Sequence, residues 1–397
     1  MSRLLRINGI AAALILLSVT ALSAQPVDTL TVMSYNVLNY PDAAETGRND
    51  DLRKVIQSVG PDIIIVQEMW EEDDIAEFEK EVLTNREYLY PQRYYGTNQN
   101  VSIYYNRDKV QYTQPVVINP DMVFGYRPRT IAGYRFQCKL PLDTAATFWI
   151  FGAHLKAGGE HWTNEDTEDS IRYHETGAFV EHVNTNFDSD THYMLAGDFN
   201  IYDAAEPAYQ RLMNELNYPV FDPVETAGDW HSQGEFSHVH TQSTRGPNQD
   251  LGDGGSTGGL DDRFDFILTS ATFRDTTDLW YIENTYQAYG NDGNHLNDAI
   301  NEGLNSAVSP EIADALHRAS DHLPVVAKFG VHLLAERGDV NTDGEITQED
   351  VNLIADIILQ EAPKPGSTAR ALADVNSDGT VDVRDIVVLM KKHSLEE

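Results

Sequence analysis

Six short polar motifs, each at or beside the end of an apolar run, constrain this chain more than any other feature. Each brings a carboxylate, imidazole or carboxamide to a position where a buried strand prefers apolar residues, and an unpaired charge there is costly. Six such motifs indicate one shared site at the end of a sheet, with oxygen ligands that suit Mg²⁺ and Asp–His pairs that suit acid–base chemistry. The motifs are SYNVLN (34–39), VQE (66–68), GAHLK (152–156), GDFN (197–200), RFDFIL (263–268) and SDHLPV (320–325).

Strand and helix patterns alternate along the same part of the chain. Apolar or alternating runs predict strands at 29–38, 61–68, 100–106, 147–155, 191–199 and 263–270. Helical spacing predicts helices at 51–59, 71–83, 168–186 and 205–216. Periodicity alone therefore indicates an α/β or α+β domain and does not decide between the two.

The motifs and their order resemble the endonuclease/exonuclease/phosphatase family over residues 27–329. The resemblance implies an α+β fold in which two packed mixed β-sheets are flanked by helices, a four-layer α/β/β/α sandwich. It also implies a metal-dependent phosphodiesterase, that is, a hydrolase acting on ester bonds.

The resemblance implies a role for each polar residue of the motifs. Glu68 matches the ligand of the catalytic Mg²⁺ (or Mn²⁺), and Asp265 with His322 matches an acid–base dyad. His154 would help to protonate the leaving group, and either Asp198 or His322 would take the proton of the water. The expected metal-site residues are Asn36, Glu68 and Asp321, and the expected catalytic residues are His154, Asp198, Asn200, Asp265 and His322.

The charge of the chain bears on the substrate. Of the net charge of −35, the residues from Asp339 onward carry −8 and the first 24 carry +2, which leaves −29 on residues 25–338. Such a surface repels polyphosphates at low salt, although divalent ions and a local basic groove can compensate. Arg127, Arg129 and Arg245 are the candidate substrate-phosphate contacts for such a groove.

Three functions remain open at this point. We expect a phosphodiester substrate, with nucleic acid favoured. A lipid or small-molecule phosphodiester or phosphate ester is the alternative, because the acidity of the domain favours it. An inactive binding protein, attached through its C-terminal tail, is the alternative from another class.

A long polar segment from Gly228 to Asp262 precedes the RFDFIL motif. It is rich in Gly, Asp, Ser and His, and a loop of this length inside a compact domain is usually functional. We expect this loop to lie over the mouth of the site.

The C-terminal tail repeats one unit twice. A twelve-residue acidic loop is followed by an amphipathic helix, first in DVNTDGEITQED (339–350) and again in DVNSDGTVDVRD (374–385). Carboxylate and amide oxygens at this spacing are calcium ligands. Position 12 is Asp rather than the EF-hand Glu, and this resembles the dockerin module, which implies bound Ca²⁺ and a cohesin-type partner. The expected ligands are Asp339, Asn341, Asp343, Thr347, Asp350, Asp374, Asn376, Asp378, Asp382 and Asp385.

The N-terminus has the pattern of a secretory signal. Arg3 and Arg6 form a basic region, Ile10–Leu22 is apolar, and small residues follow at Ser23 and Ala24. We therefore expect a signal peptide at 1–24, a catalytic domain at 25–332, a dockerin-like module at 338–395, and a secreted protein without a transmembrane segment after cleavage.

Overall fold

The computed structural model describes most of the chain, and the predicted signal peptide lies outside the described residues. No helix within the described parts is long and apolar enough to cross a membrane. The described residues are 27–41, 47–69, 71–84, 88–91, 100–123, 125–139, 142–158, 167–275, 278–333, 335–359, 367–376, 378 and 380–393.

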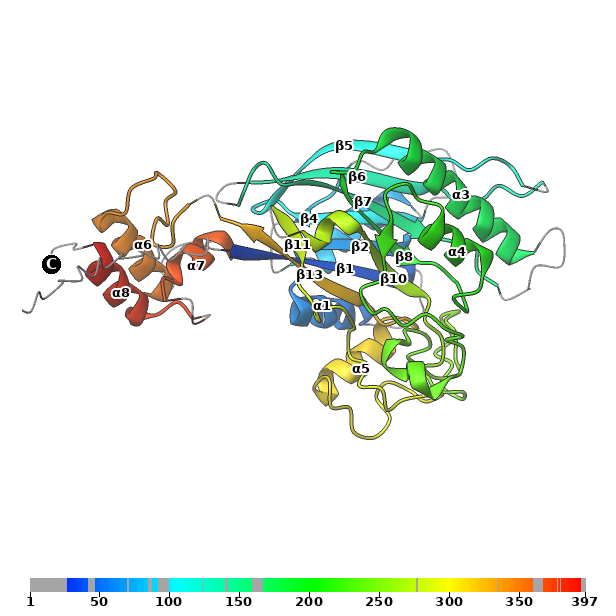
Figure 1. Cartoon of the computed structure of the whole chain (residues 1–397). Helices are drawn as coiled ribbons and strands as arrows, with labels where there is room; N and C mark the ends of the chain where they lie inside the picture. Colours follow the sequence, from blue (N-terminus) through cyan, green and yellow to red (C-terminus); the bar gives the residue numbers. More distant parts are fainter. Residues whose placement is uncertain are drawn as a thin grey trace, which may run out of the picture.

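Two mixed β-sheets form the centre of the catalytic part (Figure 1). In the first sheet the order is β11-β13-β1-β2-β4-β3, with β12 also on β13, and only β1 and β2 pair in parallel. Its strands are β1 (Val27–Tyr40), β2 (Ile63–Met69), β3 (Tyr88–Leu89), β4 (Val101–Asn106), β11 (Leu279–Tyr281), β12 (Gln287–Ala288) and β13 (Val325–His332).

The second sheet has the order β5-β6-β7-β8-β10-β9, and β7 and β8 are its parallel pair. All six strands predicted from the sequence are present, because long apolar runs identify strands that are buried on both faces. The sequence did not predict β5, β6 or β13. The strands are β5 (Val110–Ile118), β6 (Ile131–Cys138), β7 (Thr147–His154), β8 (His192–Asp198), β9 (Val220–Phe221) and β10 (Asp265–Ser270).

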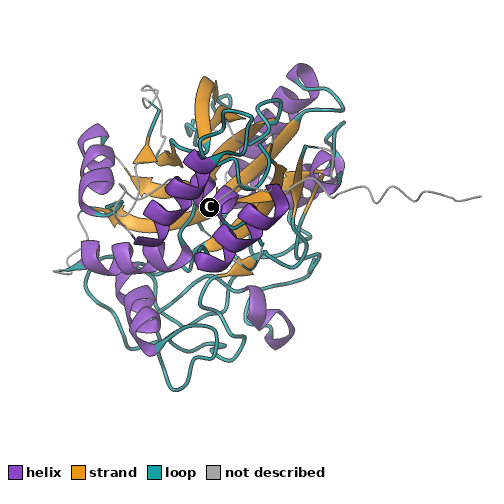
Figure 2. Ribbon diagram, turned by 90° about the vertical axis from the view of Figure 1, so that its left-hand side faces the viewer, coloured by secondary structure: helices purple, strands orange, loops and turns teal. Residues whose placement is uncertain are grey.

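Helices cover the outer faces of both sheets, which confirms the four-layer α+β prediction (Figure 2). One apolar cluster fills the space between the sheets, a second packs the first sheet on α1 and α5, and a third packs the second sheet on α3 and α4. The helices are α1 (Arg48–Val59), α2 (Glu72–Glu81), α3 (Glu168–Asn186), α4 (Pro207–Asn214) and α5 (Pro310–Ala319), with 3₁₀ turns η1 (Gly234–Val239) and η2 (Ala271–Arg274).

Gly197, at the end of β8, allows β7 and β8 to approach closely. Its φ is +151°, and a Cβ there would lie 1.8 Å from the carbonyl oxygen of Ala153. No side chain fits this space, so only glycine allows the next residue, Asp198, to emerge beside β7.

The tail forms three helices at one end of the molecule, beside the start of β1 (Figure 1). They are α6 (Gln348–Leu359), α7 (Ser367–Ala373) and α8 (Val383–His393). The two helices predicted after the acidic loops correspond to α6 and α8, whereas α7 was not predicted.

Candidate active site

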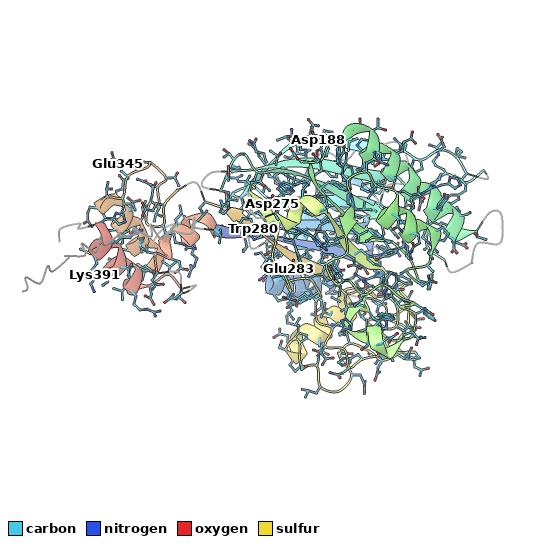
Figure 3. All side chains as sticks on the ribbon, in the orientation of Figure 1. Asp188, Asp275, Trp280, Glu283, Glu345 and Lys391 are labelled. Atoms are coloured by element: carbon cyan, nitrogen blue, oxygen red, sulfur yellow. The ribbon has the colours of Figure 1, made fainter. Side chains whose placement is uncertain are left out.

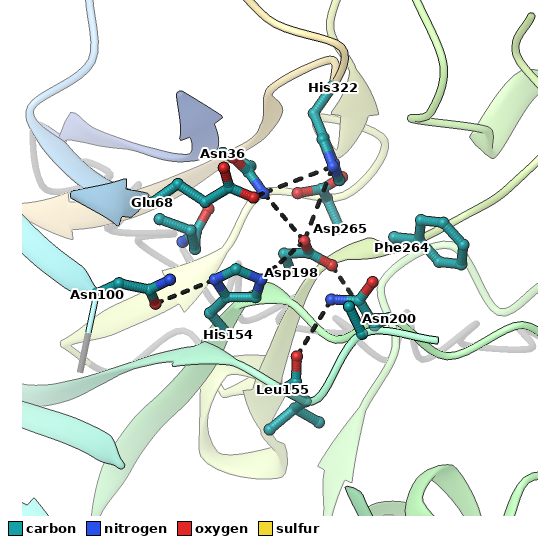
Figure 4. Close-up of polar contacts among 12 residues, drawn as sticks. Asn36, Glu68, Asn100, His154, Leu155, Asp198, Asn200, Phe264, Asp265 and His322 are labelled. Carbon is teal, nitrogen blue, oxygen red and sulfur yellow. Dashed lines mark hydrogen bonds and ion pairs between the residues drawn. The ribbon is translucent and has the colours of Figure 1, made fainter. Parts of the chain in front are cut away.

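Strand register brings the polar motifs to one edge of the two sheets. His154 of β7 pairs with Asp198 of β8, and Asp198 pairs in turn with Asp265 of β10. Paired residues on adjacent strands point to the same face of a sheet, so these three side chains lie side by side. From the other sheet, the Nδ2 atom of Asn36 reaches Oδ2 of Asp198 at 3.1 Å and joins the two edges (Figure 4).

Asn36 links the carboxylates of the site. Its Nδ2 atom lies 3.0 Å from Oε1 of Glu68 and 3.5 Å from Nε2 of His322, and its Oδ1 accepts the N–H of Leu38. The amide nitrogen therefore faces the site, and this orientation fits a supporting residue better than a direct metal ligand.

Glu68 and Asp321 have the chemistry of a magnesium site. Both line the catalytic cavity, and the buried Oδ1 of Asp321 has no hydrogen-bond partner among the described residues. A buried carboxylate oxygen without a partner is costly, and a cation would satisfy it. The residues present therefore fit a divalent metal with oxygen ligands.

Asp265 and His322 form the predicted dyad. Oδ2 of Asp265 lies 2.8 Å from Nδ1 of His322, and both residues are buried. Burial alone would lower the pKa of His322, but the neighbouring carboxylates raise it well above its ordinary value. These carboxylates belong to Asp265, Asp198 and Asp321. The imidazole is thus held in its charged form.

Asp198 is the carboxylate whose pKa lies closest to neutral pH in this cluster. Burial raises its pKa to about 7, even though the neighbouring His322 acts in the opposite direction. Its Oδ1 accepts the N–H of Asn200, and its Oδ2 lies 3.5 Å from Nε2 of His154. Burial also lowers the pKa of His154 well below its ordinary value, so this imidazole is neutral. Nδ1 of His154 faces Oδ1 of Asn100 at 3.0 Å, which leaves the Nε2 lone pair toward Asp198.

The polar cluster lies at the base of a cavity of about 290 Å³. The cavity is lined by Leu38, Asn39, Glu68, Arg129, His154, Ala157, Gly158, Asp198, Asn200, Tyr202, Gln242, Gly254, Ser256, Phe264, Asp321 and His322. Gln242, Gly254 and Ser256 belong to the 228–262 segment, so the prediction that this loop lies over the site is confirmed.

Four lining residues other than glycine have a left-handed backbone. The φ angles are +43° at Leu38, +45° at Asn39, +65° at Glu68 and +52° at Asn200. Such conformations cost on the order of 1 kcal/mol each and are concentrated at functional sites. Their occurrence around one cavity indicates a site whose geometry is held by the surrounding fold.

The three candidate arginines lie in different environments. Arg129 is half-buried and lines the cavity, whereas Arg127 is exposed nearby in sequence. Arg245 is fully buried, and both of its terminal nitrogens bond the carboxylate of Asp253. The prediction that Arg245 contacts substrate is therefore wrong: a guanidinium with no exposed surface and a bidentate partner holds the loop instead.

Gln242 and Asn100 were missed by the sequence analysis. Nε2 of Gln242 lies 2.6 Å from Nε2 of His322 and 3.1 Å from Oδ2 of Asp321, and Asn100 contacts His154. Neither residue belongs to a recognisable motif. The only available signal was the unusual length of the loop that carries Gln242.

The two acidic loops of the tail have matching geometry. In each, the carboxylate at position 1 accepts the N–H of position 5, as Asp339 does for Asp343 and Asp374 does for Asp378. The carboxylate at position 12 is fully buried and accepts the N–H groups of positions 3 and 9. These all-oxygen donor sets fit calcium.

Comparison with known families gives two matches. The sequence profile of the endonuclease/exonuclease/phosphatase family matches residues 33–322, so the chain belongs to this family of phosphoesterase fold. The profile of the dockerin type I domain matches residues 337–392. Dockerin domains bind calcium in general and pair with cohesins. A comparison with curated proteins found no match.

Solved structures share the fold of the catalytic part. An endonuclease/exonuclease/phosphatase family protein from Bacteroides thetaiotaomicron is 18% identical, with a TM-score of 0.48 over 78% of this chain and 98% of that one. A mannosyl-6-phosphatase from the same species is also 18% identical, with a TM-score of 0.48 over 76% and 99%. D. rerio TDP2 complexed with single-strand DNA product is 14% identical, with a TM-score of 0.47 over 76% and 98%. At these values the likeness carries no statement about the substrate.

Proposed function

We propose that the chain is a secreted, Mg²⁺-dependent phosphodiesterase whose catalytic cluster is built on Asp198, His322, Asp265, His154 and Glu68. The observation that carries the proposal is the paired shift of pKa at the base of the cavity. The carboxyl group of Asp198 is raised to about 7, while the imidazole of His322 is held charged. Groups pushed apart in this way take the separate roles of base and electrophile.

Asp198 suits the role of general base. A base works best when its pKa lies near the operating pH, and the carboxyl group of Asp198 meets this condition. His322 suits the opposite role, because a charged imidazole can neutralise charge that develops on the phosphoryl oxygens. Asp265 fixes the orientation of His322 through Nδ1.

His154 begins as a proton acceptor, because its Nε2 lone pair faces Asp198. The proton that Asp198 takes from the water can then pass to His154, which donates it to the leaving oxygen. When bound at Glu68 and Asp321, Mg²⁺ would add Lewis-acid polarisation of the phosphate. Asn200 positions Asp198 by donating its backbone N–H to Oδ1.

The expected substrate is a phosphodiester that reaches the cavity singly, as a small molecule or at an accessible point of a nucleic acid strand. Arg129 is the Lys/Arg side chain among the described lining residues, beside the carboxylates of Glu68, Asp198 and Asp321. With Arg245 buried, a continuous basic groove through the three candidate arginines is not formed. This favours compact phosphodiesters over duplex DNA, and nucleic acid becomes the second candidate.

The substrate class is tested with a matched panel in one Mg²⁺ buffer. We expect bis-(4-nitrophenyl) phosphate and a dinucleotide to be hydrolysed with kcat/KM at least about 10-fold above 4-nitrophenyl phosphate and above duplex DNA per bond, because the cavity carries one arginine for a single phosphate. Higher kcat/KM on the monoester would replace the phosphodiesterase with a phosphatase. Higher kcat/KM on duplex DNA would restore the nuclease reading.

The tail is proposed as a calcium-binding attachment module with a cohesin-type partner, over residues 338–395, following a catalytic domain at 25–332. The support is the repeated loop geometry together with the exposed apolar side chains of α6 and α8, including Leu359, Val383 and Val387.

A further inference from the structure

Helix α3 presents two buried charged side chains toward the wall of the catalytic cavity. Arg172 and Glu175 lie one turn apart on the helix, and both are fully buried. Neither belongs to the motifs at the strand ends. Both contact the backbone of the segment that follows β7, and that segment carries Ala157 and Gly158 of the cavity lining.

Glu175 accepts one hydrogen bond on each carboxylate oxygen. Oε1 accepts the backbone N–H of Arg129 at 2.6 Å, and Oε2 accepts the backbone N–H of Lys156 at 2.9 Å. Arg129 lines the cavity, and its Nη1 donates to the carbonyl oxygens of His154 and Leu155. One carboxylate therefore joins the segment of Arg129 to the segment that follows His154.

Arg172 holds the same wall through the opposite polarity. Its Nη1 donates to the carbonyl oxygens of Lys156 and Gly158 at 2.9 and 2.8 Å. Its charge is balanced by Glu206 and Asp169, at 2.9 and 2.8 Å. Because Arg172 has these two counter-ions, charge balance does not explain Glu175, and the two backbone N–H groups do.

Only an ionised Glu175 can make both bonds. A protonated carboxyl group turns one oxygen into a donor, and that donor would face a backbone N–H. Burial raises the pKa of Glu175 to about 7, against the opposing effects of the two N–H groups and of Arg129 and Arg172. Tyr126 is a further titratable group near this carboxylate. The bonds to Arg129 and Lys156 thus change within a physiological range of pH.

We propose that Glu175 is a positioning residue whose ionised carboxylate fixes Arg129 in the cavity wall for contact with the substrate phosphate. The phosphate contact rests on the proposed function of the site. The clamp of Glu175 on the backbone of Arg129 and Lys156 rests on geometry alone, so the two parts can fail separately.

The clamp is tested by hydrogen exchange of the full-length protein. In the wild type, the amides of Arg129 and Lys156 should lose protection about 10-fold between pH 8 and pH 6, after correction for intrinsic exchange, because each loses a charged acceptor. Glu175→Gln replaces one acceptor oxygen by an amide donor, so it should show the low protection at both pH values. Glu181→Gln, an exposed acid on the same helix, should behave as the wild type. Equal protection at both pH values in the wild type would overturn the clamp without any variant.

Kinetics test the effect on substrate. At pH 8 with bis-(4-nitrophenyl) phosphate, Glu175→Gln should raise KM about 10-fold and change kcat less than about 3-fold, since it loosens a binding contact rather than the acid–base groups. Arg129→Ala should raise KM similarly, and the double variant should add nothing further. Additive effects, or a fall in kcat alone, would overturn the positioning role. Absence of any hydrolysis by the wild type would remove the proposed function, while the exchange result would still decide the clamp.

A stability readout separates this role from a general packing role. The ordinary pKa of 4.5 is raised in the folded protein to about 7, so folding favours the neutral acid. The stability contribution is complete below about pH 4.5 and is lost as pH rises through about 7. The melting temperature of the wild type relative to Glu175→Gln should therefore fall between pH 5 and pH 8. A constant difference would contradict the titration of Glu175.

Discussion

Replacing Asp198 by Asn is expected to lower kcat by about 10²-fold to 10⁴-fold, the usual contribution of a positioned general base. Asn retains the shape of the side chain and an oxygen for the N–H of Asn200, so the loss would arise from the missing proton acceptor. The measurement is kcat with bis-(4-nitrophenyl) phosphate for the variant and the wild type, with thermal unfolding as a check on folding.

Asp275→Asn is the matched control for this experiment. Asp275 is exposed on the outside of the catalytic part, where Figure 3 shows it among the surface side chains. It should leave kcat unchanged. Near-normal kcat in Asp198→Asn, with the control unaffected, would exclude Asp198 as the base and leave His322 as the alternative.

The second large effect concerns calcium and the tail. Asp350 and Asp385 are fully buried, and each lies in a loop with several further carboxylates. Without a cation these charges repel one another, and so small a module has little core to offset the repulsion. The free energy of calcium binding then becomes free energy of folding. Calcium should raise the helicity and the protease resistance of residues 338–397 from a largely unfolded to a folded state.

The variants for this test follow the repeat. Asp339→Ala combined with Asp374→Ala should abolish the gain from calcium, whereas Glu349→Gln, an exposed neighbour in the first loop, should retain it. A chain that ends near Gly338 should keep its hydrolytic activity, because the catalytic cavity lies wholly within the preceding residues. A tail that is equally helical without calcium, or a truncated chain without activity, would contradict the separation of the two parts.

The position of the site was predictable because its residues stand at the ends of strands. Parallel pairing of β1 with β2 and of β7 with β8 brings their carboxyl ends to one edge, so Asn36, Glu68, His154 and Asp198 converge once the strands are correctly identified. The Asp265–His322 pair was predicted from two motifs and is present at 2.8 Å. The duplicated tail was predictable for a similar reason, since its contacts are local in sequence.

The contacts that hold the cavity wall were not predictable, because they depend on the way distant segments pack. Arg245 is no different from a surface arginine in sequence, and only the folded loop buries it against Asp253. Glu175 lies within an ordinary helical pattern, and its partners are backbone N–H groups that carry no sequence signal. Short strands such as β9 and β12 were missed for the same reason.

The most direct test of the central claim is hydrolysis of bis-(4-nitrophenyl) phosphate by the purified mature chain before EDTA, after EDTA, and after Mg²⁺ is restored. Glu68→Gln is measured in parallel, with magnesium binding followed by calorimetry. The account predicts activity that is lost with EDTA and recovered with Mg²⁺, and a variant that folds normally yet binds Mg²⁺ at least about 10-fold more weakly. Activity that persists in EDTA, or full magnesium affinity in Glu68→Gln, would contradict it.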